Sequence, residues 1–237
     1  MRLDRFLVDK KLVKSRSKAQ NLISLGLVKV NGNVILKSAY EVKPDNDVEI
    51  TQGTFVSRGG YKLVNFLSRF DFDFNQKLVL DIGCSTGGFS DFFLKNNAKV
   101  FGVDVNDVLD KSIKENENFT FVKANILDLN DFEDKLKKHN VSKFDFISVD
   151  VSNLRLEYFI FDLKEFMHEN SYLIVLFKPA YVLNKSVDDE LALSLAEELK
   201  GKLAKSFEVV SFELSELKGK VKNQGSSEVF FLLKLKK

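Results

Sequence analysis

The stretch LVLDIGCSTGGF, residues 78–89, decides the fold of this 237-residue chain. An apolar run at 78–80 leads into a turn of small residues, and a helix-like segment at 89–94 follows. A buried strand, a glycine-rich turn and a helix together form the nucleotide-holding corner of a doubly wound sheet. Glycine lets the backbone approach a ligand closely, and the start of a helix offers unpaired N–H donors. We therefore predict an adenosine-bearing cofactor at this corner.

A second carboxylate narrows the choice of cofactor. Asp104 ends the next strand-like run and lies 23 residues after Asp81, close to the roughly 20 expected for an acid that reaches a ribose diol. The glycines lack the order typical of NAD sites, and no Gly-Lys-Ser/Thr follows for a nucleoside triphosphate. An acid two residues before Gly83 suits a ligand that carries a positive charge and no phosphate. The spacing favours S-adenosylmethionine over NAD or ATP.

The rest of the chain after residue 56 alternates strands and helices. Predicted strands are 78–81, 99–104, 119–123, 144–150, 172–177, 207–214 and 228–235. Predicted helices are 57–70, 89–96, 131–139, 155–168 and 187–205. Apolar strands that alternate with helices indicate a mostly parallel sheet covered on both faces, an α/β fold.

Composition excludes several classes of protein. A hydrophobic content of 44%, with 23 Phe, is ample for a core. The single cysteine, Cys84, excludes an internal disulfide framework, and two His argue against a histidine metal site. Every apolar run is far shorter than the ~18–20 residues that span a bilayer, and the chain begins with an amphipathic helix and not a signal peptide. We expect a cytoplasmic protein with no metal and no membrane insertion.

Residues 1–50 form a separate small α+β unit in this interpretation. The predicted elements are a helix over 2–10, a second helix opened by a Ser17-x-x-Gln20 capping box and stopped at Gly26, a hairpin that turns at Asn31-Gly32, and a strand at 47–50. The first 37 residues hold nine Lys or Arg against two acids. A basic lobe on a slightly acidic body is typical of a protein that binds a polyanion.

This segment resembles the RNA-binding domain named for ribosomal protein S-four. The matching residues are Arg2-Leu3-Asp4-x-x-Leu7, Ser15-Arg16-x-x-Ala19-x-x-Leu22-Ile23, Gly26-x-Val28-x-Val30-Asn31-Gly32, Lys37 and Val42. The resemblance implies RNA contact by the basic residues Arg2, Arg5, Lys14, Arg16, Lys18 and Lys29. The alternative is a solvated charged helix face, which is the usual meaning of a charge run.

Three polar residues stand at the ends of predicted strands, where a core strand has no use for them, and a fourth lies on a helix. Asp150 and Lys178 close predicted strands, Glu228 opens the last one, and Lys62 lies on the helix that enters the domain. Ligands bind outside the carboxyl ends of such strands. A lysine that caps a buried strand is by itself usually only snorkelling to solvent.

Together with the glycine corner, these residues resemble the FtsJ-type 2′-O-methyltransferases, within the hemolysin-TlyA family of rRNA methyltransferases. The motifs that carry the resemblance are Ser57-Arg58-Gly59-Gly60-x-Lys62-Leu63, Asp81-x-Gly83-x-Ser85-Thr86-Gly87-Gly88-Phe89, Val103-Asp104-Val105, Asp150-x-Ser152, Lys178-Pro179 and Glu228. It implies a Rossmann-like methyltransferase domain over 57–237, joined by a linker at 51–56 to the RNA-binding domain at 1–50.

The resemblance also implies residue roles. Lys62, Asp150, Lys178 and Glu228 would form a catalytic tetrad for methyl transfer to a cytidine ribose of rRNA or a ribosomal subunit. S-adenosylmethionine would be held by Asp81, Gly83, Ser85, Thr86, Gly87, Gly88, Phe89, Asp104 and Asn125. Two neighbouring ammonium groups depress each other's pKa, so Lys178 is either partly neutral or a cation that steadies the developing alkoxide.

Four segments depart from the family pattern, namely Asn106-Asp107-Val108-Leu109, Asn125-Ile126-Leu127, Asn153-Leu154 and Lys178-Pro179-Ala180-Tyr181-Val182. They leave two alternatives open: a non-catalytic ribosome-binding or assembly factor, and a membrane-acting cytolysin as the family's historical name suggests. A base-directed methyltransferase is disfavoured, since no Asn/Asp-Pro-Pro-aromatic segment and no second cysteine are present.

Overall fold

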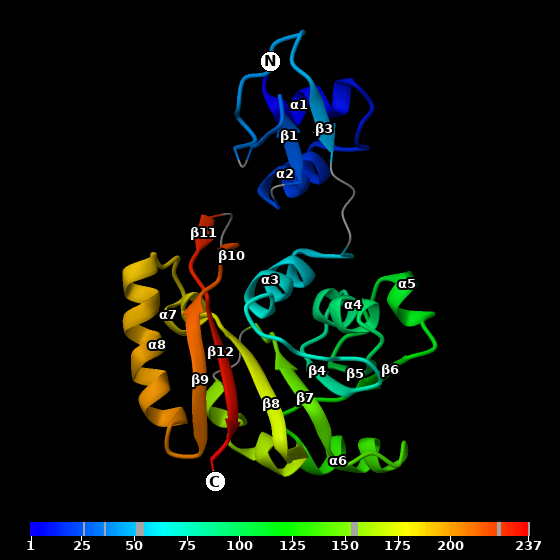
Figure 1. Cartoon of the computed structure of the whole chain (residues 1–237), viewed down its shortest axis with the longest axis vertical. Coiled ribbons are helices and arrows are strands. Elements are labelled where there is room, and N and C mark those ends of the chain that lie inside the picture. Colours follow the sequence, from blue (N-terminus) through cyan, green and yellow to red (C-terminus); the bar gives the residue numbers. More distant parts are fainter. Residues whose placement is uncertain (26, 36, 51–54, 153–155, 222–223, 237) are drawn as a thin grey trace. The chain divides into compact units, whose positions relative to one another are not determined.

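The computed structural model describes residues 1–25, 27–35, 37–50, 55–152, 156–221 and 224–236. The chain folds into two compact units, Met1–Arg58 and Gly59–Lys237 (Figure 1). Residues 51–54, most of the predicted linker, lie outside the described residues. Each unit has a core of its own.

The N-terminal unit is the predicted small α+β domain. Its elements are α1 (Leu3–Asp9), α2 (Arg16–Ser24) and an antiparallel sheet in the order β2-β1-β3, made of β1 (Val28–Val30), β2 (Asn33–Val34) and β3 (Val48–Ile50). The hairpin turns at Asn31 and Gly32, both with positive φ (50° and 77°), as a tight two-residue turn requires. Leu3, Leu7 and Ile23 are fully buried and join the two helices in one core.

Helix α2 begins two residues earlier than its predicted capping box allows. Ser15 is the N-cap, and its hydroxyl accepts a hydrogen bond from the backbone N–H of Lys18 at 3.2 Å. Ser17 lies inside the helix. The side-chain amide of Gln20 donates a hydrogen bond to Asp4 and does not cap the start of α2. The predicted capping box is therefore wrong. Gly26, the predicted helix stop, lies outside the described residues.

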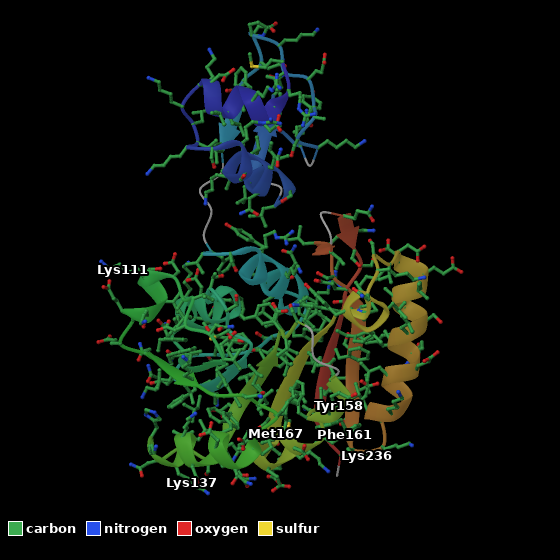
Figure 2. All side chains as sticks on the ribbon, turned by 180° about the vertical axis from the view of Figure 1, so that it is seen from behind. Lys111, Lys137, Tyr158, Phe161, Met167 and Lys236 are labelled. Carbon is green, nitrogen blue, oxygen red and sulfur yellow. The ribbon has the colours of Figure 1, made fainter. Side chains whose placement is uncertain are left out.

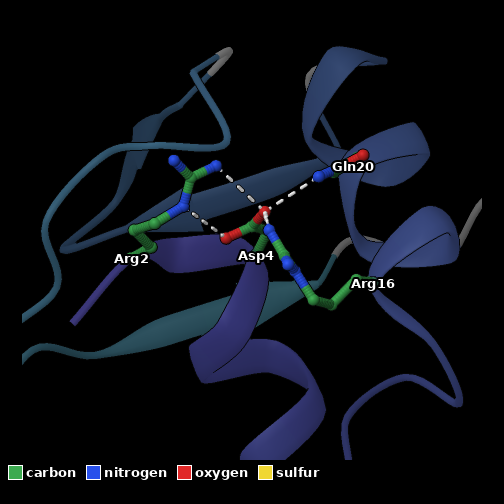
Figure 3. A network of polar contacts seen from close by, with 4 residues as sticks. All are labelled: Arg2, Asp4, Arg16 and Gln20. Carbon is green, nitrogen blue, oxygen red and sulfur yellow. Dashed lines mark hydrogen bonds and ion pairs between the residues drawn. The ribbon is translucent and has the colours of Figure 1, made fainter.

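A buried carboxylate ties α1 to α2 (Figure 3). The Asp4 side chain is 0% exposed and accepts hydrogen bonds from both ends of the Arg2 guanidinium (3.0 and 3.1 Å), from Arg16 (2.9 Å) and from Gln20 (2.9 Å). Bonding from Arg2 above all, opposed by burial and helped by Arg16 and Gln20, holds the pKa of Asp4 well below its usual range. Arg2 and Arg16, both predicted RNA contacts, thus also stabilise their own domain.

The second unit is built on a sheet of seven strands among the described residues, in the order β6-β5-β4-β7-β8-β12-β9. The strands are β4 (Leu78–Ile82), β5 (Lys99–Asp104), β6 (Phe119–Lys123), β7 (Phe144–Val149), β8 (Met167–Phe177), β9 (Phe207–Leu214) and β12 (Val229–Leu235). Pairs along β6-β5-β4-β7-β8 are parallel, and β12 runs antiparallel between β8 and β9 (Figure 1). The predicted mostly parallel α/β sheet is confirmed.

Helices cover both faces of this sheet. Neighbouring residues of β12 point to opposite faces, so the contacts of Phe230 and Phe231 identify the helices on each face. Phe230 stacks on Phe66 of α3 (Arg58–Leu67), with ring centroids 4.5 Å apart, and lies 6.2 Å from Phe89 of α4 (Gly88–Lys95). Phe231 belongs to the cluster on the other face, with Phe132 and Ala196. These two come from α6 (Leu129–Lys137) and α8 (Asp189–Leu203).

The structure corrects three element predictions. The predicted helix at 155–168 is two short 3-10 turns, η1 (Leu156–Tyr158) and η2 (Asp162–Phe166), and β8 begins already at Met167. Short helices α5 (Lys111–Lys114) and α7 (Pro179–Leu183) were not predicted. The segment between the predicted strands 207–214 and 228–235 contains a hairpin of β10 (Gly219–Val221) and β11 (Gln224–Ser226), which was not predicted.

Candidate active site

The register of the sheet brings the predicted catalytic residues to one edge. Val149 pairs with Ile82 on one side and with Val175 on the other, so β4 and β7 end together and β8 runs two residues further, to Phe177. Val229, the first residue of antiparallel β12, pairs with Phe177, the last residue of β8. Asp150, Lys178 and Glu228 each lie one residue beyond these strand ends. Secondary structure and topology thus place residues far apart in the sequence side by side.

The four predicted tetrad residues form two ion pairs. Lys62 Nζ of α3 pairs with Glu228 Oε2, and both side chains are buried, with 7% and 6% of their surface exposed. Lys178 Nζ pairs with Asp150 Oδ1 and also donates to Ser152 Oγ at 3.2 Å. The charge of Glu228 also acts on Lys178. The pairs are therefore neighbours, and their four charges balance.

Lys178 is protonated in this arrangement. Burial by itself lowers the pKa of its ammonium group, but the carboxylates of Asp150 and Glu228 more than offset burial and raise the pKa above its ordinary value. The interpretation of Lys178 as partly neutral, which rested on repulsion from Lys62, is wrong. Glu228 neutralises Lys62 directly, so the second ammonium no longer depresses the first.

A cavity of about 360 Å³ opens beside Asp150. Its lining contains four of the predicted cofactor residues, Gly83, Ser85, Asp104 and Asn125. The other lining residues are Ile82, Val103, Val105, Asn106, Val108, Ala124, Ile126, Asp150, Val151 and Ser152. The volume lies within the range of ~300–1,000 Å³ usual for ligand pockets.

Asp104 organises the rim of this cavity. Its Oδ2 accepts from the backbone N–H of Ser85 at 3.0 Å, and its Oδ1 accepts from that of Asn106 at 2.9 Å. A carboxylate has about four acceptor sites, so two remain for a diol. Gly83, with φ of 80°, lies so close to β7 that an added Cβ would be 2.8 Å from the Asp150 carbonyl oxygen. Glycine is required there by both backbone and space.

Five predicted cofactor residues do not line the cavity. Asp81 is fully buried, Thr86 is exposed on the loop, and Phe89 packs in the core. Gly87 is the left-handed N-cap of α4 and lies against Ile113, and Gly88 is the first residue of that helix. These five residues belong to the glycine-rich corner but do not line the cavity beside Asp150.

Asp81 is held inside the fold by two hydroxyls. Ser90 Oγ donates to its Oδ2 at 2.6 Å, and Ser148 Oγ donates to its Oδ1 at 2.8 Å. Burial raises the pKa of Asp81 to about 6, although both serine hydrogen bonds act in the opposite direction. Asp81 joins α4, β4 and β7 and does not face the cavity. A sequence pattern cannot separate this role from ligand contact, since both need an acid at this position.

Some residues near the site were missed. Asn106 and Val108 line the cavity, although the sequence marked their loop only as a departure from the family pattern. Tyr181 lies 5.9 Å from Lys178 Nζ, with 37% of the residue exposed. Tyr181 lies on the short helix α7. Pro179 was the signal in the sequence for the start of this helix, because proline is common at the first position of a helix.

A second cavity, of about 450 Å³, lies at the opposite edge of the sheet. It is lined by Glu157, Tyr158, Phe161, Lys202, Lys205 and Ser206. Figure 2 shows Tyr158 and Phe161 near Lys236, where β12 ends. No tetrad residue reaches it. Over the described residues, no cluster of three or more His, Cys, Asp or Glu is suited to a metal, and no helix has the length and apolarity to cross a membrane.

The predicted RNA-binding residues are distributed over the N-terminal unit. Arg5, Lys14 and Lys18 are exposed, Lys29 on β1 is half-buried, and Arg2 and Arg16 keep about half of their side-chain surface in solvent while they bind Asp4. Cys84, in contrast, is a buried thiol whose pKa burial raises, so it stays protonated and unreactive.

Two family models match the chain. Residues 55–236 match the FtsJ-like methyltransferase family, and residues 1–48 match the S4 domain. The chain therefore belongs to the FtsJ-like methyltransferases and carries an N-terminal S4 domain. The predicted family and fold class are confirmed.

Similar proteins agree with this assignment. The chain is 30% identical to the 23S rRNA (cytidine-2′-O)-methyltransferase TlyA of Campylobacter jejuni, over 98% of each chain. It is 37% identical to Hemolysin A of Brachyspira hyodysenteriae over 63% of this chain and 65% of that protein. Among solved structures, a protein assigned as a hemolysin from Lactococcus lactis is 30% identical, with a TM-score of 0.64 over 77% of this chain and 89% of that one.

Proposed function

We propose that this protein transfers a methyl group from S-adenosylmethionine to a ribose 2′-hydroxyl of ribosomal RNA, with a cytidine as the target. The observation that carries the proposal is the convergence of two buried or half-buried ion pairs, Lys62–Glu228 and Lys178–Asp150, beside a ligand-sized cavity. The relationship to the Campylobacter enzyme over nearly the whole chain supports the choice of rRNA and cytidine.

The cavity suits the methyl donor. Asp104 has acceptor sites left for the ribose diol, Asn125 offers an amide, and none of the described lining residues has a basic side chain that would select a phosphate. When bound, S-adenosylmethionine supplies a methyl group that its positive sulfur already activates. The protein therefore has to place and deprotonate the attacking hydroxyl.

Asp150 is the acceptor for the hydroxyl proton in this proposal. Its carboxylate lines the cavity, and its Oδ1 is paired with the Lys178 ammonium. A carboxylate has about four acceptor sites, so it can also accept a hydrogen bond from a substrate hydroxyl. As the methyl–sulfur bond breaks and the ribose oxygen bonds the methyl carbon, the 2′-hydroxyl proton would pass to this carboxylate and S-adenosylhomocysteine would be left.

Lys178 acts as a cation. Because its pKa is raised, it keeps its proton and donates to the ribose oxygen while negative charge develops there. Next to it is the Lys62–Glu228 ion pair, and the charge of Glu228 helps to raise the pKa of Lys178. Lys62 and Glu228 therefore position and tune the reacting pair.

The S4 domain supports a structured RNA substrate, since its exposed basic residues suit phosphate contacts. The proposal is tested with ribosomal subunits from cells that lack this protein. Purified enzyme and radiolabelled S-adenosylmethionine should label rRNA, and ribose-methylation mapping should place the label on one or a few cytidines. Label on a base, or none on either subunit, contradicts the proposal.

The role of Lys178 has a direct test. We expect Lys178→Met to lower single-turnover methyl transfer by roughly 10²–10³, the usual cost of removing a charge-stabilising donor. Lys178→Arg keeps a permanent cation and should retain more activity than Lys178→Met at every pH from 7 to 10. Calorimetry should show unchanged cofactor affinity in both variants. An inactive arginine variant that folds and binds cofactor would instead identify Lys178 as a base.

A further inference from the structure

A glycine outside the tetrad contacts one of its members. Gly219 begins strand β10, and a Cβ added there would overlap the Glu228 Oε1 atom and lie 2.6 Å from Cδ and 3.3 Å from Cγ. Its φ lies outside the left-handed region, so the backbone accepts any residue. Glycine in a strand often marks a place where another group approaches closely. At Gly219 that group is the Glu228 carboxylate.

The backbone around Glu228 is already fixed by other contacts. Its carbonyl oxygen accepts from the N–H of Ser215 at 2.8 Å, and the preceding residue, Ser227, donates its N–H to the Val187 carbonyl at 3.0 Å. These two hydrogen bonds restrict the backbone at residues 227 and 228, so a backbone shift cannot easily move the Glu228 side chain. Lys62 holds Oε2, and the bare Cα of Gly219 lies against Oε1.

We infer that Gly219 is a positioning residue for the methyl-transfer reaction, an inference that rests on the proposed function. Its missing side chain is what lets the Glu228 carboxylate lie flat against the β10–β11 hairpin and reach Lys62. Gly219 acts through Glu228 and touches neither substrate nor cofactor. Residue 219 at the start of β10 thereby acts on the tetrad, although it contributes none of the four charged side chains.

The test compares two glycines of the same hairpin. Gly219→Ala should lower kcat at least tenfold while the KM for S-adenosylmethionine changes less than twofold, because the cofactor cavity does not include Glu228. Gly225→Ala is the matched control, since its new methyl would meet only the Lys218 side chain at 3.8 Å or beyond. Gly225→Ala should keep wild-type kcat. Equal loss in both variants, or wild-type kcat in Gly219→Ala, overturns the inference.

A double-mutant cycle separates positioning from general damage. Glu228→Asp keeps the charge but shortens the side chain by one methylene group. The methyl group that Gly219→Ala adds then displaces the carboxylate less. We expect the added loss in kcat from Gly219→Ala to shrink from tenfold or more to less than threefold in the Glu228→Asp background. An undiminished loss means that Gly219 acts by another route.

A second readout does not depend on activity. The shift in urea midpoint caused by Gly219→Ala should be smaller in the Glu228→Asp background than in the wild type, since one contact causes both effects. If the wild type methylates no RNA while this coupling is present, the proposed function fails and the contact stands. If RNA is methylated but both the kinetic and the urea couplings vanish, the role of Gly219 fails alone.

Discussion

Single residues in this protein show how burial decides the function of a charged group. Asp81 and Asp150 both follow buried strand residues of the same sheet. Asp81 is fully buried, where two serine hydroxyls donate to it; it is a structural carboxyl group whose pKa burial raises to about 6. Asp150 lies at the cavity beside Lys178. The two carboxyl groups therefore differ in how deeply they are buried near the carboxyl ends of the strands.

The buried carboxyl of Asp81 makes stability depend on pH. Between pH 3.8 and about 6 the folded protein holds the Asp81 proton and the unfolded chain does not, so raising the pH across this window lowers the free energy of unfolding. Asp81→Asn removes this penalty. We expect the variant to match wild type near pH 4 and to exceed it above pH 6 by up to about 3 kcal/mol.

Urea unfolding at pH 4 and pH 7.5 measures this effect. The control is Asp134→Asn, because the Asp134 side chain is 73% exposed and its replacement should change stability equally at both pH values. If Asp81→Asn is less stable than wild type at pH 7.5, the carboxylate is worth more to the fold than its burial costs, and the prediction is wrong.

At the scale of elements, helix ends depend on tertiary contacts that a local pattern does not contain. Ser15 and Ser17 both stand where an N-cap of α2 would be plausible by spacing. The chain uses Ser15, because Arg16 and Gln20 inside the helix are then directed at Asp4 of α1. The contact between helices thus selects the helix start.

The choice of cap can be measured with a matched pair of variants. Ser15→Ala should lower the stability of the N-terminal unit by about 1 kcal/mol, the usual cost of a lost N-cap. Ser17→Ala should change stability by less than about 0.5 kcal/mol, since Ser17 is exposed within the helix. Urea unfolding followed by helical circular dichroism tests both. The reverse order of effects would restore the predicted capping box.

At the scale of the whole molecule, two units with separate cores should unfold separately. The small unit relies on nine buried apolar residues and on the Asp4 network. Asp4→Asn leaves two arginines without their carboxylate and should lower the stability of this unit by about 2 kcal/mol. Scanning calorimetry should show one transition that moves and one that stays. Asp9→Asn, an exposed change on the same helix, should move neither.

The two units also divide the work of binding and chemistry in the proposed function. Replacing Arg5, Lys14 and Lys18 by alanine should weaken rRNA binding and reduce the slope of log affinity against log salt by about 2–3, because each phosphate contact contributes ~0.7–0.9. The affinity for S-adenosylmethionine should not change. A salt slope equal to that of wild type would mean that these residues form only a solvated helix face.

Much of this protein could be predicted from its sequence. Hydrophobic period and glycine placement predicted every strand of the large sheet, since buried parallel strands read as continuous apolar runs. The polar residues at strand ends were also visible, because a core strand tolerates no charge there. The helix at 155–168 failed because its apolar spacing is compatible with α-helix and with 3-10 turns alike.

The sequence by itself determined the chain order of the strands in the large sheet, because these follow from local patterns of apolar and polar side chains, and its motifs indicated the family and the four candidate catalytic residues. Only the tertiary structure decided which lysine pairs with which carboxylate, that Lys178 keeps its proton, that Asp81 is buried, and that Gly219 makes room for Glu228. Charge state and close contact depend on neighbours distant in the chain. The antiparallel insertion of β12 beside β8 brings those neighbours together.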